Sequence, residues 1–70
     1  MDKNNSITIT TRDRALLAWE NSMELVRSFE NFGKEISDND RAAKAFRKFA
    51  EEEAQHAAEF LEILHSYEKN

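Results

Sequence analysis

The stretch GKEISDNDRAAKAF, residues 33–46, decides how this chain is organised. Its central residues 37–40, SDND, favour turns and helix N-termini and include no apolar side chain. Ser37 followed three positions later by Asp40 resembles a capping box, which predicts the start of a second helix. The chain has no proline and a single glycine, Gly33, which marks either fraying of a first helix or a close approach between helices.

Both sides of this break carry a helical period. Thr10 or Thr11 can cap the first helix, with Asp13 in its first turn. Apolar residues then recur at Ala15, Leu16, Trp19, Met23, Val26, Phe29, Phe32 and Ile36. The second helix is expected from about Asp38 to Tyr67. Two long helices with a short connection predict an all-α chain folded as an antiparallel hairpin.

The division of the chain follows from this pattern. Residues 1–9 are polar and are expected to form a flexible N-terminal arm, and residues 10–68 form the hairpin. A chain of 70 residues is one small domain, and a lone hairpin has no second layer to cover its apolar side. The side chains expected to stay partly wet are Phe29, Phe32, Phe46, Phe49 and Phe60. We therefore expect a homodimer in which two hairpins complete a four-helix bundle.

Composition excludes several classes of function. The net charge is −4, from 14 acidic and 10 basic residues, which argues against a nucleic-acid partner. The absence of cysteine excludes a thiol nucleophile, cysteine-ligated zinc and iron–sulfur sites. No apolar run reaches the length of a membrane span, and mixed charges on the polar faces do not favour a membrane surface. A cytoplasmic protein is expected.

The second helix places polar residues inside an apolar ladder. The ladder consists of Ala42, Phe46, Phe49, Glu53, His56, Phe60, Ile63 and Tyr67. Glu53 and His56 are three positions apart, so they share one helix face. A buried carboxylate needs a compensating partner, and one carboxylate with one imidazole suits iron or manganese and can also bind zinc. A second Glu-x-x-His, at Glu62 and His65, lies about half a turn away and is expected to face solvent.

A metal centre needs more ligands from the first helix. Glu20 is the best candidate, because it borders the apolar stripe next to Trp19. Two hairpins would then supply four carboxylates and two imidazoles, the ligand set of di-iron and di-manganese helical bundles. The acids Glu24, Glu52 and Glu59 form either a secondary or entry site or simply a solvated surface.

Two segments carry a resemblance to a known family. AFRKFAEEEAQHAAEFLEIL, residues 45–64, resembles the second helix of rubrerythrins and short ferritin-like proteins, and AWENSMELVRSF, residues 18–29, is similar to their first helix. The 33 positions from Glu20 to Glu53 match the separation in rubrerythrins. With two helices and no cysteine, the chain looks more like the half-length, encapsulated type of ferritin.

This resemblance implies a ferritin-like four-helix bundle and a function. The implied activity is that of a di-iron ferroxidase in iron storage or detoxification, with two iron ions per dimer held by Glu20, Glu53 and His56. Manganese or zinc could substitute. Dimers could build a ring, and an encapsulin shell in the cytoplasm is a further implied partner. The alternatives are a rubrerythrin-like peroxide reductase with an external electron donor and a non-catalytic helical oligomerisation module.

Overall fold

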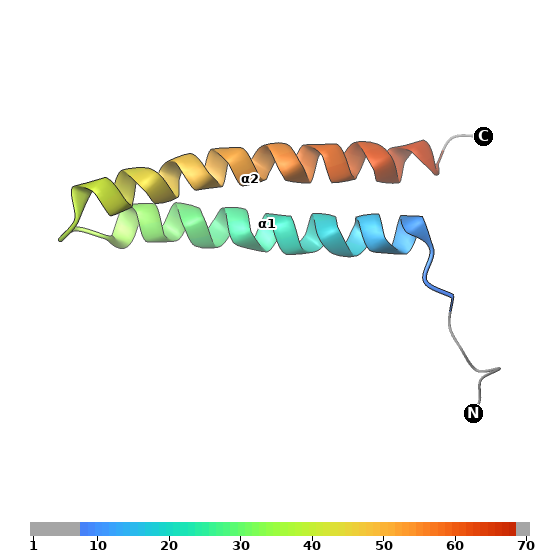
Figure 1. The fold of residues 1–70 in the computed structure, drawn as a ribbon, viewed down its shortest axis with the longest axis horizontal. Helices are drawn as coiled ribbons and strands as arrows, with labels where there is room; N and C mark the ends of the chain where they lie inside the picture. Colours follow the sequence, from blue (N-terminus) through green and yellow to red (C-terminus); the bar gives the residue numbers. More distant parts are fainter. Residues whose placement is uncertain (1–7, 69–70) are drawn as a thin grey trace, which may run out of the picture.

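The computed structural model describes residues 8–68 and contains two helices, α1 (Thr11–Glu35) and α2 (Asp40–Ser66). They run antiparallel, side by side along their whole length, with the connection at one end and the start of α1 and the end of α2 at the other (Figure 1). The described residues include no strand. This confirms the all-α hairpin. Of the expected N-terminal arm, residues 1–7 lie outside the described part, and residues 8 and 9 are exposed and non-helical.

Short polar side chains set the start of each helix. Thr10 caps α1: its hydroxyl accepts a hydrogen bond from the Asp13 N–H at 3.0 Å, and its own N–H donates to the Asp13 carboxylate at 3.2 Å. This is a capping box, which satisfies two otherwise free N–H groups. In α2 the cap is Asn39, whose side-chain oxygen accepts from the Ala42 N–H at 2.9 Å.

The start of α2 corrects one expectation. A capping box from Ser37 to Asp40 does not form, and α2 begins at Asp40 rather than at about Asp38. Asn39 is in an extended conformation, with φ −152° and ψ 94°, so the helix can begin only after it. Its amide oxygen accepts from the Ala42 N–H, whereas a Ser37 cap would accept from the Asp40 N–H.

Small residues form the contact between the two helices. The buried residues of α2 follow a strict seven-residue spacing: Ala43, Ala50, Ala57 and Leu64. Those of α1 are Ala15, Ser22, Val26 and Gly33. We call these eight residues the inner seam. Side chains of this size let the two helix backbones approach closely. The ladder that begins at Ala42 lies beside the inner seam and not in it. Each ladder residue is either one or three positions along the chain from a seam residue, so its side chain is rotated around α2 away from the seam.

Gly33 lies where the two helices approach one another closely. A Cβ at this position would lie 2.7 Å from Arg47 Cγ and 3.3 Å from the Ala43 carbonyl oxygen. The guanidinium of Arg47 reaches across from α2 and donates to the Gly33 carbonyl at 2.9 Å. Of the two explanations for this glycine, close helix approach is therefore the right one.

Four aromatic rings gather on one side of the hairpin, near the connection. They are Phe29, Phe32, Phe46 and Phe49, with neighbouring ring centroids 5.4–6.2 Å apart. Phe32 and Phe49 remain 44% and 43% exposed, and Phe29, Phe46 and Phe60 are half-buried. The expectation that a single hairpin leaves these rings partly wet is confirmed.

Neither described helix combines the length and the apolar character that a membrane span requires.

Candidate metal centre

Glu53 and His56 form a pair on α2. They are one helical turn apart, and Glu53 Oε1 lies 3.1 Å from His56 Nδ1, which donates to it when it carries the proton. The Glu53 side chain is only 17% exposed, whereas that of His56 is 61% exposed. The pair therefore has an inner carboxylate and an outer imidazole, and Nε2 of the imidazole is left for another ligand.

Ser22 connects this pair to α1. It is a polar residue of the inner seam, 4% exposed, and hydrogen bonding by its hydroxyl is the largest cause that lowers the pKa of Glu53. The contacts with His56 lower it further, and partial burial opposes them. Glu53 is therefore a carboxylate at neutral pH, the form that binds a cation.

The pair sits between apolar side chains that nothing in the described part of the chain covers. Phe49 and Phe46 lie one and two turns before it on α2, and Phe60 and Ile63 follow it. We call this surface the aromatic face; its members are Phe29, Phe32, Phe46, Phe49, Glu53, His56, Phe60 and Ile63. The contacts of Phe32 with Phe46, and of Phe29 with Phe46 and Phe49, show that α1 contributes to the same side.

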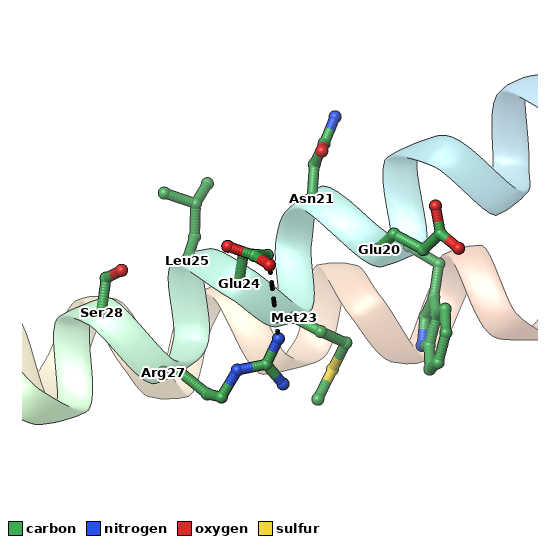
Figure 2. A pocket seen from close by; sticks show the side chains of 8 residues that line it. Glu20, Asn21, Met23, Glu24, Leu25, Arg27 and Ser28 are labelled. Atoms are coloured by element: carbon green, nitrogen blue, oxygen red, sulfur yellow. Dashed lines mark ion pairs between the residues drawn. The ribbon is translucent and has the colours of Figure 1, made fainter.

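Glu20 lies elsewhere. It is exposed and comes two positions before Ser22, about 200° away around α1, so it is on the side of the helix turned away from Ser22 and Glu53. Figure 2 shows the same rotation in its neighbours: Leu25 and Met23 extend to opposite sides of α1. Among residues 8–68, no three His, Cys, Asp or Glu side chains are grouped closely enough to hold a metal ion. The hairpin therefore brings Glu53 and His56 together but leaves Glu20 apart.

The three acids considered as a secondary site are also dispersed. Glu24, Glu52 and Glu59 are all exposed. Glu24 lies 3.8 Å from Arg27 on its own helix (Figure 2), and Glu52 lies 3.9 Å from Lys48. Exposed pairs of this kind stabilise a helix only slightly. The depression in which Glu20 and Glu24 lie is lined only by residues of α1, so it has no opposite wall.

The second Glu-x-x-His behaves as expected. Glu62 and His65 are both exposed, on a part of α2 away from the inner seam. This confirms that they face solvent in the hairpin. The two motifs thus differ in their surroundings and not in their local spacing.

One hairpin supplies too few ligands for a closed metal site. It offers one ionised carboxylate and one imidazole nitrogen, whereas a stable iron or zinc site uses four or more donor atoms. The donor types fit iron or manganese, but the number fits only if a second copy adds its own pair.

Comparison with known proteins adds nothing to this picture. No family model matches the chain, and neither the curated proteins nor the solved structures contain a match.

Proposed function

We propose that two copies of this chain pair through the aromatic face and bind iron between them, and that the protein oxidises Fe²⁺ to Fe³⁺. The observation that supports this proposal most is the position of Glu53 and His56. A largely buried, ionised carboxylate and a free imidazole nitrogen lie in the middle of an otherwise apolar, uncovered surface. A second hairpin on that surface would bury the apolar side chains and bring a second pair of ligands.

The reaction follows from the donor types. Each of two Fe²⁺ ions gives up one electron, and O₂ takes both electrons with two protons to become hydrogen peroxide. Carboxylates are hard donors that bind Fe³⁺ more tightly than Fe²⁺, so Glu53 favours the oxidised product. The neutral His56 nitrogen adds a ligand without adding negative charge. We retain the cytoplasm as the proposed location, since a chain without cysteine needs no oxidising compartment.

Metal and assembly should be linked under this proposal. Two Glu53 carboxylates brought to one interface without a cation repel one another and weaken the dimer. A bound cation removes that repulsion, and any ligand that binds the assembled form stabilises it by mass action. Fe²⁺ or Mn²⁺ should therefore raise both the dimer fraction and the melting temperature.

The two Glu-x-x-His motifs provide a matched test. Glu53→Gln and His56→Ala should each lower the initial rate of Fe²⁺ oxidation in air at least about tenfold, as expected when one catalytic group worth about 1.4 kcal/mol or more is removed. They should also lower the iron bound per chain. The controls Glu62→Gln and His65→Ala make the same chemical changes on the same helix and should leave both quantities unchanged. Equal effects at the two motifs would contradict the proposal.

A second candidate, a non-catalytic oligomerisation module, is favoured by one observation. Glu53 already has partners within its own chain, the Ser22 hydroxyl and His56, so its partial burial is explained without a metal. This candidate predicts a dimer whose mass and melting temperature do not change when a chelator or Fe²⁺ is added. It also predicts that purified protein from iron-supplemented medium contains no iron.

A further inference from the structure

The charges of α2 are separated along its length. Residues 41–48 contain four basic side chains and no acidic one, namely Arg41, Lys44, Arg47 and Lys48. Residues 51–62 contain five acidic side chains and no lysine or arginine, namely Glu51, Glu52, Glu53, Glu59 and Glu62. When two such helices lie antiparallel, the basic half of each is at the level of the acidic half of the other, and the field of each whole helix favours this direction without direct ion pairs across the aromatic face. In a parallel pair, like charges would face each other.

Glu53 lies at the centre of this pattern. It is the middle residue of the 27 in α2 (Asp40–Ser66), with equal lengths of helix on either side. Antiparallel packing centred on Glu53 places Phe46 of one copy at the level of Phe60 of the other. The same alignment places residues 41–48 at the level of residues 58–65, which include Glu59 and Glu62.

The shape of the aromatic face also changes from one end to the other. Near the connection, the cluster of Phe29, Phe32, Phe46 and Phe49 stands out from the surface, with two rings more than two-fifths exposed. Toward the helix ends, an apolar groove of about 260 Å³ lies between α1 and α2. Its lining residues are Thr11, Arg14, Ala15, Ala18, Phe60 and Ile63. The groove exists because Ala15 and Ala18 are small where the other end has phenylalanine.

We propose that a second copy of this chain docks antiparallel along α2, with a two-fold axis at Glu53, so that the aromatic cluster of each copy packs into the groove of the other. The inference rests on the dimer of the proposed function and adds its direction and register. It makes the protruding end and the hollow end complementary, and it places the basic half of each α2 at the level of the acidic half of the other. It also brings the two Glu53–His56 pairs to the axis, where neither copy alone completes a site.

Disulfide trapping tests the register directly, because the chain has no cysteine of its own. In the proposed register Ala42 of one copy lies beside Ile63 of the other, whereas the two copies of residue 42 lie about 33 Å apart along the axis. A disulfide forms only when the two Cα atoms are within about 7 Å. A mixture of the Ala42→Cys and Ile63→Cys chains should give a mixed disulfide under mild oxidation, and each chain alone should give none. The reaction is run without metal and with Mn²⁺.

Controls make each outcome decisive. Lys34→Cys carries an exposed thiol about 200° around α1 from Phe32, away from the aromatic face, and should not couple to Ile63→Cys. Ala18→Trp fills the groove and should reduce the mixed disulfide at least about tenfold while leaving helix content unchanged. Disulfides of Ala42→Cys with itself would show a parallel dimer and overturn the proposal, as would a dimer that gives no mixed disulfide. The test measures no iron chemistry. The docking mode can therefore hold if the ferroxidase proposal fails, and the ferroxidase proposal can hold if the docking mode fails.

Discussion

The two sides of α2 are built on different principles. One side carries alanine at every seventh position, from Ala43 to Ala57. These alanines are buried against α1, and none of them is more than 4% exposed. The other side, the aromatic face, carries larger apolar residues, of which Phe49 and Ile63 remain 43% and 42% exposed. The chain therefore buries its small residues and leaves its large ones in contact with water.

The hairpin completes the contact between its two helices at the inner seam, but it leaves the aromatic face open. Burial of large apolar side chains contributes most to stability, so a surface that keeps them half-exposed is suited to a partner. Glu53 and His56 belong to the open side. Their chemistry is thus placed where a second molecule can add to it, and three variants can test this contrast.

The largest effect on folding is expected at the inner seam. Ala50→Leu adds three carbon atoms at a buried position of the inner seam, and overpacking at such a site costs about 1–3 kcal/mol per chain. Thermal denaturation followed by circular dichroism at fixed protein concentration measures this loss. Ala58→Leu, on an exposed position of the same helix, should change stability by less than about 0.5 kcal/mol. Equal losses would mean that the two helices are not in close contact at Ala50.

The aromatic face should respond in assembly rather than in folding. Phe49→Gln removes a ring of which about two-fifths is still exposed in the single hairpin. The loss should weaken association by about 1 kcal/mol for each of the two copies in the dimer. Sedimentation equilibrium should show a dimer weakened about thirtyfold, which corresponds to about 2 kcal/mol. Met23→Gln changes a side chain nine positions before Phe32, about 180° away around α1, and should leave the dimer intact. If the two variants behave alike, the aromatic face is not the interface.

The smallest effect is expected at Ser22, where the two sides of α2 are linked through Glu53. Ser22→Ala removes the hydroxyl that lowers the pKa of Glu53, at a cost of about 0.5–1.5 kcal/mol at neutral pH. A lowered pKa stabilises the fold above the pKa of the unfolded chain, and this stabilisation is lost as the pH falls through the pKa of the folded state. Melting temperatures measured from pH 7 to pH 3 should therefore converge for the wild type and Ser22→Ala at the acidic end.

A constant difference across that pH range would show that Ser22 acts by packing alone. Ser28→Ala, a change of the same size on α1, is the matched control and should show no such convergence, because Ser28 is not among the groups that shift the pKa of Glu53.

Much of the fold could be predicted from local signals. Thr10 with Asp13, and the SDND segment, set the helix ends to within two residues, because helix caps depend on side chains next to the free N–H groups. The choice between Ser37 and Asn39 as the cap could not be made, since both residue types favour that position. The inner seam was not predicted either, because periodicity gives weight to large apolar residues, whereas close helix contact selects small ones.

The candidate site could be predicted only in part. Three-residue spacing brought Glu53 and His56 together, as the helix geometry requires. Ser22 was missed, although its position seven residues after Ala15 places it in the seam and was the available signal. The side on which Glu20 lies depends on how α1 is rotated against α2, and apolar residues on several sides of α1 leave that rotation open. Glu20 as a ligand stays a prediction.

No described side chain in the hairpin is less than 2% exposed, so the single chain has no enclosed interior. If the proposed dimer forms, its stability would rise with the concentration of the protein. Newly made or diluted chains would be open to proteases, while chains above the association threshold would be protected. The abundance of the protein would then regulate its own turnover, without any separate control element.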